Sequence, residues 1–378
     1  MKKFLFLPIL LLFFFDGHSE AQNNAVNYAY SCDFTKDGVH YYIMSDGKNV
    51  YVGPEKYQDY WTPNPSYYGD IVIPAEVTYE GKTYAIYHIL PNCFTETQVK
   101  SVTIEAPIKE LGHECFSKST VEYVSLPPTI TSLGNQCFMK CKQLETVIIP
   151  STAPLESLGT MCFYWCKNLK ALRLPDTVKE LGEQCFKHTG LTSFDVPASL
   201  TKLPAECFKD SELESISFPN TMINNFGSKC FCSTKLKSFE FPLNFFSWQI
   251  SGRIFENCTS LEKLVLRGDF KYLDNFLFRC FNLKEVYIYN IEPPEAAMGT
   301  FEDLPEDRVL YVPIESVEAY KAKEPWNTFT IIGIETDEIK QLTSPSTVDN
   351  NWYNLNGQRV STPDKGIFIH NGKKVLVK

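Results

Sequence analysis

A Cys-Phe pair that recurs along the middle of the chain limits what this sequence can fold into. Phe255, Leu277 and Phe301 continue the series at the Phe position, and successive anchors lie 22 to 25 residues apart. A regular period of this length is typical of repeat proteins, in which each unit packs mainly against its neighbours. The seven complete pairs are Cys93-Phe94, Cys115-Phe116, Cys137-Phe138, Cys162-Phe163, Cys185-Phe186, Cys207-Phe208 and Cys230-Phe231.

Each anchor is followed by a short segment that predicts a β-strand ending at proline, as in Leu144–Pro150 and Leu169–Pro175. Apolar residues alternate in these segments, and proline ends the strand because it lacks an N–H group. A Leu-Gly step such as Leu181-Gly182 then leads to the next anchor, and we expect its glycine to allow a tight turn. One unit cannot bury its own apolar face, so about ten units must stack around one core.

The segments CFMKCKQLETVIIP and MCFYWCKNLKALRLP resemble the BspA-like leucine-rich repeats of bacterial surface proteins, over about residues 70–313. The resemblance implies a β-rich, right-handed solenoid of about ten repeats with a parallel concave sheet. It also implies an exported or surface role in adhesion or protein binding. This chain departs from the family in two ways: cysteine stands before Phe where the family usually has alanine, and four copies are one residue shorter.

The N-terminus has the layout of a secretory signal peptide over residues 1–21. Lys2 and Lys3 precede an apolar run that ends at Phe15, and Ser19 and Ala21 form a small-x-small cleavage pattern. The alternative is an uncleaved anchor, but the run is too short to cross a bilayer as a helix. No later stretch predicts a transmembrane span. We therefore expect an exported protein that is extracellular or on the cell surface, including the outer membrane.

Residues 22–69 are rich in tyrosine and predict an N-terminal β-cap, with DGVHYYIMSDGKNVYV as a hairpin-like segment. A cap is needed because the outer face of a terminal repeat would otherwise be bare. The functional alternative is an aromatic platform for sugar rings, with Trp61 among its aromatic residues. At the other end, Val309–Pro313 predicts a final strand, and residues 314–334 predict a C-terminal cap with a short helix before Pro325 and a closing strand.

Residues 335–350 are polar and predict a linker, and residues 351–378 predict a small β-unit. Asn356-Gly357 and Asn371-Gly372 are strong hairpin-turn signals between alternating apolar residues. The unit carries five basic residues and one acid. It resembles the C-terminal sorting module of proteins that use the type IX secretion route. The alternative is a plain β-hairpin tail that pairs with the solenoid or with another chain.

Thirteen cysteines in an exported chain first suggest disulfides. Their spacing instead predicts two columns of buried free thiols, because stacked strands hold neighbouring side chains too far apart for a disulfide. Cys32, Cys230 and Cys232 are the better disulfide candidates. We predict no metal, no cofactor and no enzymatic activity, since the repeat explains the Cys-x3-Cys spacings and no catalytic motif is present. The second column is Cys141, Cys166, Cys258 and Cys280.

The outward residues of the strands form the predicted partner surface, which is sterically open and carries no continuous charged or aromatic stripe. A net charge of −9 argues against a general nucleic-acid binder. We predict a non-catalytic adhesion or binding protein whose solenoid binds a macromolecule, a protein rather than a glycan. The alternatives are a carbohydrate-binding or cell-envelope scaffold protein that uses the tyrosine-rich block, and a solvated face without a partner. The candidate residues are Tyr123, Ile148, Arg173, Asp195, Glu240, Lys263, Glu285 and Tyr287.

Overall fold

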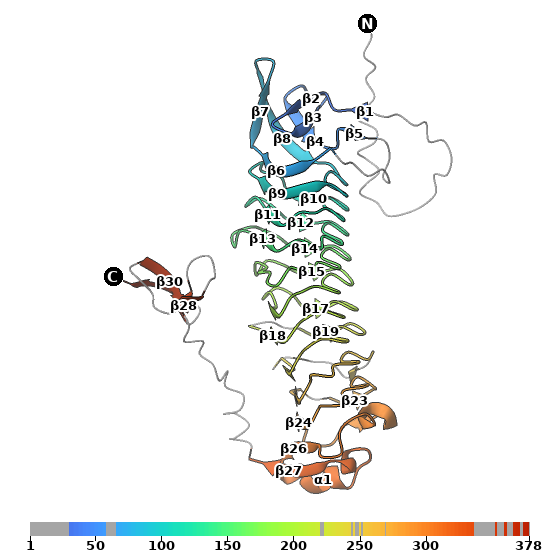
Figure 1. Cartoon of the computed structure of the whole chain (residues 1–378). Helices are drawn as coiled ribbons and strands as arrows, with labels where there is room; N and C mark the ends of the chain where they lie inside the picture. The colour runs from blue at the N-terminus through green and yellow to red at the C-terminus, as the bar shows by residue number, and fades with distance from the viewer. Residues whose placement is uncertain are drawn as a thin grey trace, which may run out of the picture.

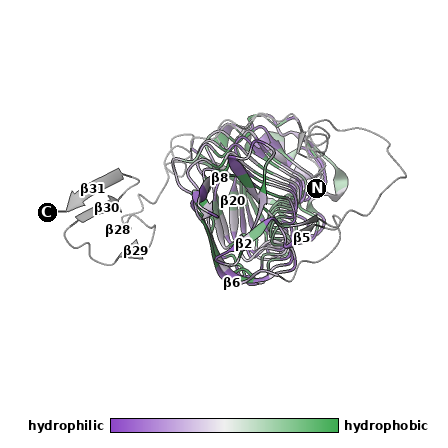
Figure 2. Cartoon of the chain, turned by 90° about the horizontal axis from the view of Figure 1, so that it is seen from above, coloured by the Kyte–Doolittle hydropathy of each residue, from purple (hydrophilic) through white to green (hydrophobic). Residues whose placement is uncertain are grey.

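The structure is a computed structural model. It describes residues 30–57, 66–219, 223–242, 245, 249–250, 252–268 and 270–335, together with the backbone of four strands between 352 and 377. The predicted signal peptide, the interdomain linker and Trp61 lie outside the described residues. Within the described part, the chain winds into a solenoid of stacked coils (Figure 1). Viewed from above, successive coils superimpose (Figure 2), so the predicted β-solenoid with parallel sheets is confirmed.

The longer strands of successive coils pair in parallel, as the repeat predicts. The register joins Val102, Val124 and Val147 across three neighbouring strands, with each of these side chains buried. The first block is β6 (Tyr68–Ile73), β9 (Gln98–Ile104), β11 (Tyr123–Ser125) and β13 (Thr146–Ile148). Next come β16 (Ser193–Asp195) and β18 (Ser215–Ser217), and then β20 (Ser238–Glu240), β22 (Lys263–Leu266), β24 (Glu285–Ile288), β26 (Val309–Pro313) and β27 (Thr330–Ile334).

The strand predicted within Leu169–Pro175 is absent, so the sheet is interrupted between β13 and β16. Leu172 and Leu174 still point inward and are buried, while Ala171 and Arg173 are exposed. The alternation of side chains is therefore kept although ladder pairing is lost. The coil stays in the stack because its Cys-Phe segment is bonded to both neighbours, through Phe138 N to Cys162 O and Phe163 N to Cys185 O, each at 2.8 Å.

A second set of parallel strands forms at the Leu-Gly steps, where the sequence had predicted only turns. Each strand has two residues, as in β12, where Leu133 is buried. The set comprises β10 (Glu110–Leu111), β12 (Ser132–Leu133), β14 (Ser157–Leu158) and β15 (Glu180–Leu181), then β17 (Lys202–Leu203) with β19 (Asn225–Phe226), and β21 (Gln249–Ile250), β23 (Tyr272–Leu273) and β25 (Glu295–Ala296).

The Cys-Phe segments form a third ladder of backbone hydrogen bonds, and we call them the turn segments. Each contains two left-handed residues four apart, such as Glu114 (φ 51°) and Lys118 (φ 59°). Their N–H groups donate to the next coil, Lys118 to the Met139 carbonyl at 2.7 Å. The donors point toward the C-terminal end, where the Arg279 N–H donates to Asp303 Oδ2 at 2.9 Å. A carboxylate therefore terminates this column of N–H groups, as a capping residue does at a helix N-terminus.

The core is one continuous apolar cluster that runs through the coils. The anchor phenylalanines stack face to face, with centroid distances from 4.9 Å between Phe94 and Phe116 to 5.8 Å between Phe208 and Phe231. Rings at this spacing and in near-parallel planes pack efficiently and fill the same position in every coil. The stack ends where Leu277 replaces Phe, and Phe255 there meets Phe276 at 6.4 Å. These contacts confirm that the repeat encodes a shared interior.

The N-terminal unit is a five-stranded sheet in the order β2-β3-β4-β8-β7. Its hairpin pairs Tyr41 with Val52 and confirms the hairpin predicted there. The strands are β2 (Phe34–Lys36), β3 (Val39–Ile43), β4 (Asn49–Val52), β7 (Glu76–Tyr79) and β8 (Lys82–Ile89), with a separate pair β1 (Tyr30–Ser31) and β5 (Lys56–Tyr57).

The C-terminal end is closed by α1 (Val317–Lys321) and three 3-10 segments, η2 (Met298–Phe301), η3 (Ile314–Ser316) and η4 (Trp326–Thr328). Trp326 and Tyr320 are fully buried, and the Trp326 Nε1–H donates to the Pro294 carbonyl at 2.9 Å. Beyond the linker, β28 (Trp352–Tyr353) pairs with β29 (Arg359–Val360) and β30 (Gly366–His370) pairs with β31 (Lys373–Val377), both antiparallel. The strands on either side of each Asn-Gly signal pair as a hairpin requires, and the turn residues Asn356-Gly357 and Asn371-Gly372 lie outside the described residues.

Candidate functional site

The strand register places the eight predicted partner residues in three groups along the solenoid. Tyr123 and Ile148 lie near the N-terminal end on β11 and β13, with Ser125 directly beside Ile148. Arg173 and Asp195 lie in the middle, at the interruption of the sheet. Four residues come together near the C-terminal end, on β20, β22 and β24, so the eight do not form one site. These four are Glu240, Lys263, Glu285 and Tyr287.

The N-terminal group belongs to a larger apolar surface, which we call the β6–β13 face. It consists of Tyr68, Val72, Tyr123 and Ile148, with exposed fractions of 75, 49, 38 and 44%. Val72 pairs in register with Thr103, which in turn pairs with Ser125 beside Ile148, so one outward row runs across all four strands. Val72 and Ile148 lie in this row, and Tyr123 lies in the neighbouring row, between Ser101 and Thr146. Large exposed apolar side chains grouped on one sheet face are typical of a surface that binds a partner.

Small polar residues separate these apolar side chains. The Ser101 hydroxyl donates to Asp70 Oδ1 at 2.7 Å, and Ser101 pairs in register with Tyr123. Hydroxyls and carboxylates at the edges of an apolar patch keep it soluble and offer hydrogen bonds to a partner backbone. The arrangement can bind a macromolecule.

The middle group makes no ion pair between its two members, although their opposite charges lie one coil apart. Asp195 instead accepts a hydrogen bond from the Ser217 hydroxyl on the next strand. Among the ion pairs of the described residues, none involves Arg173. The guanidinium is exposed and available to solvent or to a partner.

The C-terminal group is largely covered by its own contacts. Tyr287 stacks on Tyr311 with ring centroids 4.3 Å apart, and Lys263 Nζ lies 4.4 Å from the other face of the Tyr287 ring. Tyr287 is therefore only 8% exposed despite pointing outward. Burial, followed by the charge of Glu285, raises the pKa of Tyr287. The hydroxyl stays neutral and donates to Glu285 Oε2 at 3.4 Å.

Three residues of this group escaped the sequence prediction: Tyr289, Tyr311 and Arg267. Arg267 Nε contacts Glu240 Oε1 at 2.6 Å, and its guanidinium carbon lies 5.6 Å from the Tyr289 ring centroid. The alternation Tyr287-Ile288-Tyr289 and the strand that contains Tyr311 could have predicted these outward rings. The sequence prediction considered only two outward rows, which ended at Glu285 and Tyr287, so it missed this aromatic cluster.

The tyrosine-rich N-terminal block does not present its described rings as a platform. Tyr41, Tyr51 and Tyr67 are buried in the sheet and beneath it. The Tyr67 hydroxyl donates to the Gly53 carbonyl at 2.6 Å, which ties the cap to the first coil. Tyr68 is exposed but belongs to the β6–β13 face. The packing of the described rings is that of a cap core.

The two predicted thiol columns are present, and their members are free and buried. The expected disulfides among Cys32, Cys230 and Cys232 are a wrong prediction, because all three are free thiols. Cys230 lies within the first column, and Cys232 is only 4% exposed. Cys32 lies in the N-terminal unit, where its sulfur is 3.6 Å from Thr35 Oγ1 and 3.9 Å from His40 Nδ1.

His113 does not form a catalytic pair with Cys115, since Cys115 is fully buried and His113 Nε2 lies 3.2 Å from Glu114 Oε1. Across the described residues, no three His, Cys, Asp or Glu side chains are grouped to hold a metal ion. A search for membrane-spanning helices, restricted to the same residues, found none of sufficient length and apolarity.

Comparison with known families agrees with this architecture. A model described as "BspA type Leucine rich repeat region (6 copies)" matches residues 87–212, 136–249 and 201–293, which is more than half of the chain. The chain belongs to this family of leucine-rich-repeat proteins. No curated protein matches.

Several solved structures are similar to this chain. A leucine-rich repeat protein from Bacteroides ovatus is 19% identical, and the match covers 80% of this chain and 100% of that one with a TM-score of 0.41. The pneumococcal vaccine antigen PcpA is 16% identical, with 82 and 99% covered and a TM-score of 0.39. A leucine-rich cell surface protein from Faecalibacterium prausnitzii is 16% identical, with 81 and 99% covered and a TM-score of 0.35.

Proposed function

We propose that this protein is an exported, non-catalytic binding protein of the cell surface, and that its β6–β13 face binds a protein partner. The observation that carries the proposal is the group of exposed apolar side chains on one face of a parallel sheet, with Tyr68, Val72, Tyr123 and Ile148 uncovered. Membership of the BspA-type repeat family supports the same class of function. Side chains on a hydrogen-bonded sheet are pre-organised, so little conformational entropy is lost when a partner binds.

A protein fits this face better than a glycan does. Val72 and Ile148 are branched aliphatic side chains, which bury well against other apolar side chains but offer no flat ring for a sugar to stack on. Tyr123 and Tyr68 add the aromatic anchors that are enriched at protein interfaces. The neighbouring Ser101, Ser125 and Thr103 supply hydrogen-bonding groups around the anchors.

Delivery to the surface completes the proposal. Residues 1–21 direct export, and residues 351–378 act as the sorting module that carries the folded chain across the outer membrane. The polar segment 335–350 separates that module from the solenoid in the sequence. The chain would then present its sheet faces to the surface of a host or a neighbouring cell.

The test is quantitative capture of surface proteins from such cells by the biotinylated mature chain. We expect the double variant Tyr123→Ala/Ile148→Ala to capture at least about tenfold less protein than the unmodified chain. Truncating two anchors of the face removes much of the binding energy. A matched control is Tyr272→Ala/Ile291→Ala, whose side chains are exposed to similar extents, 39 and 51%, away from the β6–β13 face.

The control variant should capture as much as the unmodified chain. Equal capture by both double variants would exclude the β6–β13 face as the binding surface. Circular dichroism of both variants confirms that the sheet is intact, since outward substitutions leave the buried Val102, Val124 and Val147 untouched.

A further inference from the structure

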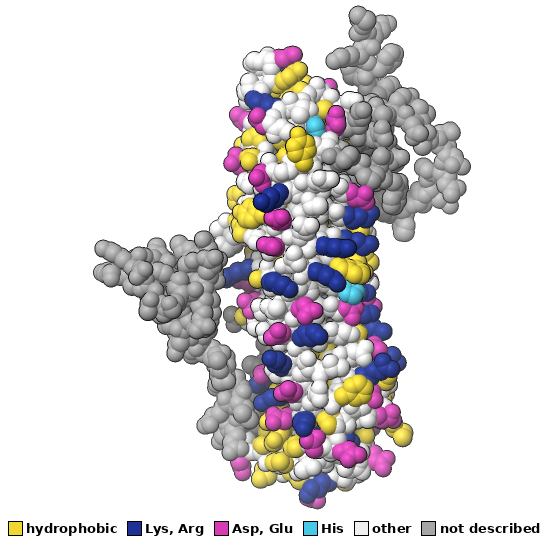
Figure 3. All heavy atoms as spheres, in the orientation of Figure 1, with side chains coloured by type: hydrophobic (Ala, Val, Ile, Leu, Met, Phe, Trp, Pro, Cys, Tyr) yellow, Lys and Arg dark blue, Asp and Glu magenta, His cyan; other side chains and the backbone are white. Residues whose placement is uncertain are grey.

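A stripe of cations follows the turn segments along one edge of the solenoid, apart from the sheet faces. Eight consecutive turn segments each carry a lysine or arginine on or directly beside them. Lys and Arg side chains gather along this edge around a histidine and hydrophobic side chains (Figure 3). The stripe is unexpected on a chain with net charge −9. We call it the cation stripe: Lys118, Lys140, Lys167, Lys187, Lys209, Lys229, Arg253 and Arg279.

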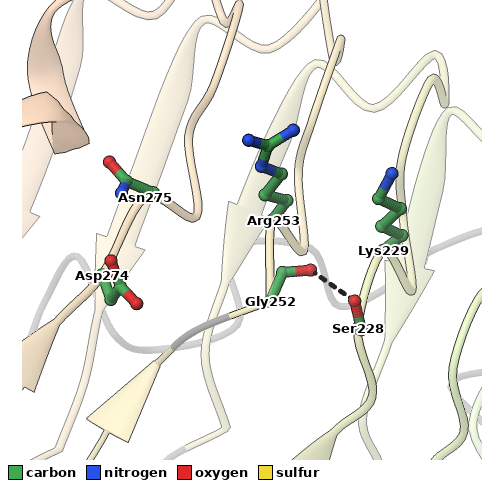
Figure 4. A pocket seen from close by; sticks show the side chains of 6 residues that line it. All are labelled: Ser228, Lys229, Gly252, Arg253, Asp274 and Asn275. Carbon is green, nitrogen blue, oxygen red and sulfur yellow. Dashed lines mark hydrogen bonds between the residues drawn. The ribbon is translucent and has the colours of Figure 1, made fainter.

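The backbone places one cation of the stripe in every coil. The Lys140 N–H donates to the Tyr164 carbonyl at 2.7 Å, and the Trp165 N–H donates to the Lys187 carbonyl at 2.9 Å. Hydrogen-bonded neighbouring segments lie about 4.8 Å apart, and the cations occupy different positions along these segments. Figure 4 shows the same arrangement further along, where Lys229 and Arg253 extend side by side from adjacent turns, and Asp274 and Asn275 line the recess next to them.

An aromatic cluster lies at the centre of the stripe. The Trp165 and His188 rings are 4.6 Å apart and 31° from parallel, and Tyr164 meets His188 edge-on at 5.8 Å. Lys167 Nζ lies 5.3 Å from the Trp165 ring centroid. These rings are partly exposed on a solenoid whose other large aromatics mostly fill the core. A flat, partly exposed ring beside a lysine is suited to a sugar that bears a negative charge.

Carboxylates pair with several cations of the stripe. Lys118 pairs with Glu96 at 2.6 Å, and Lys187 pairs with Glu206 at 2.6 Å. Glu256 similarly contacts both Lys229 and Arg253. In the described ranges, the ion pairs include neither Lys140 nor Lys167.

The pKa of His188 reflects these surroundings. Burial lowers its pKa, Asp210 opposes that effect, and the charges of Lys187, Lys167 and Lys209 lower it further. The imidazole is therefore neutral at pH 7 and serves as part of the apolar cluster. The positive charge at this place comes from the lysines.

We propose that the cation stripe binds an acidic polysaccharide of the polyuronate type, with one sugar ring stacked on Trp165 and its carboxylates on Lys140 and Lys167. The site is separate from the β6–β13 face and takes a different class of ligand. A polyuronate carries one carboxylate on every sugar, so one ring can meet the aromatic cluster while neighbouring carboxylates meet the lysines. An extended acidic peptide supplies the carboxylates but no ring for the cluster.

The experiment measures binding of a fluorescent oligogalacturonide of about ten sugars to the full mature chain at low salt, where the 30 Å screening length of 0.01 M salt preserves charge interactions. We expect Lys140→Gln/Lys167→Gln and Trp165→Ala each to weaken binding by at least about tenfold, because each removes charge-assisted or stacking contacts at the centre. The matched control is Lys179→Gln, an exposed lysine outside the stripe, paired with Glu156 at 2.7 Å, and we expect a change within about twofold.

Two probes separate charge from sugar. The methyl-esterified oligosaccharide keeps the rings and loses the charges, and a polyglutamate of equal charge keeps the charges and loses the rings. We expect both to bind more weakly than the oligogalacturonide by about tenfold or more. Absence of oligogalacturonide binding at low salt, an equal loss in the Lys179→Gln control, or equal affinity for polyglutamate or for the methyl ester would each overturn the proposal. The variant Tyr123→Ala/Ile148→Ala should bind the oligogalacturonide unchanged. The protein-binding proposal and the polysaccharide proposal can therefore fail independently of each other.

Discussion

At the scale of single residues, the second cysteine column is a set of hydrogen-bond donors rather than a column of small apolar side chains. Cys141 Sγ–H donates to the Phe116 carbonyl at 2.9 Å, and Cys166 does the same to Phe138 at 3.1 Å. In shorter copies a hydroxyl stands at the equivalent position, as in Thr189, which donates to Phe186 O at 2.8 Å. The position requires a small donor, which explains why Cys, Ser and Thr alternate there.

Burial also controls the reactivity of the thiols. It raises the pKa of Cys141 and of Cys258 from 9.0 to about 12, and it also raises the pKa of Cys137 well above its usual range. The thiolate is the reactive species, so these sulfurs are inert while the chain is folded. Cys32 differs because it is only half-buried.

We therefore predict that native protein at pH 8 is alkylated at Cys32 alone. The measurement is iodoacetamide treatment followed by peptide mass spectrometry, with a urea-unfolded sample in which all thirteen cysteines should react. Cys32→Ser should leave the native chain without label. Native labelling of Cys137 or Cys162 would show that the column opens to solvent, against this account.

The raised pKa values of the buried thiols lower the stability of the folded chain at alkaline pH. Because the folded pKa lies above the unfolded one, the unfolded chain loses thiol protons first as pH rises, and this favours unfolding. The contribution of Cys141 is complete below pH 9.0 and is lost by about pH 12. The stacked neutral thiols are thus compatible with neutral and mildly acidic surroundings.

At the scale of elements, the glycines of the Leu-Gly steps are required by close packing and not by turn conformation, which corrects the expectation from sequence. A Cβ on Gly182 would lie 2.2 Å from the Thr160 backbone nitrogen, and one on Gly134 would lie 2.7 Å from the Gly112 carbonyl carbon. The left-handed conformations are instead taken by non-glycine residues of the turn segments. Neighbouring coils are in close backbone contact at this glycine column.

We predict that Gly182→Ala destabilises the chain by about 1–3 kcal/mol, because the added methyl group must push the Thr160 backbone away. The measurement is the urea midpoint of the mature chain. Lys179→Ala, an exposed neighbour in the same coil, serves as control and should change stability by less than about 0.5 kcal/mol. An equal midpoint for both variants would mean that the coils are not in backbone contact here.

The elements with the strongest sequence signals were predictable: the repeat, the phenylalanine stack and the hairpins. The two-residue strands at Ser132–Leu133 and its equivalents were not, because one Leu-Gly step is too short to show a period. The loss of pairing at Leu172 has no local signal either, since the side-chain alternation continues through it. The cation stripe was missed because its members occupy different positions within the repeat, so no single column of the sequence contains them.

At the scale of the whole molecule, stability is a sum of coil stabilities and coil-to-coil interfaces, with the two ends as the exposed interfaces. Phe301, Tyr320, Trp326 and Phe329 form an aromatic cluster at the C-terminal end, with Phe301 and Trp326 4.9 Å apart. This cluster covers the last coil, and the Asp303 carboxylate accepts the Arg279 N–H at the same end. The cap should therefore be needed for folding, whereas the tail beyond residue 335 should be needed only for delivery.

Two truncations separate these roles. A chain ending at residue 335 keeps the aromatic cluster, so we expect it to melt at the same temperature as the full chain. Because it lacks the proposed sorting module, we also expect it to remain in the periplasm. A chain ending at residue 313 loses α1 and Trp326, exposes the apolar surface of the final coil and should melt at a lower temperature or aggregate. Differential scanning calorimetry and surface immunolabelling measure the two effects. Surface display of the longer truncation would contradict the sorting role, and equal melting of the two chains would contradict the capping role.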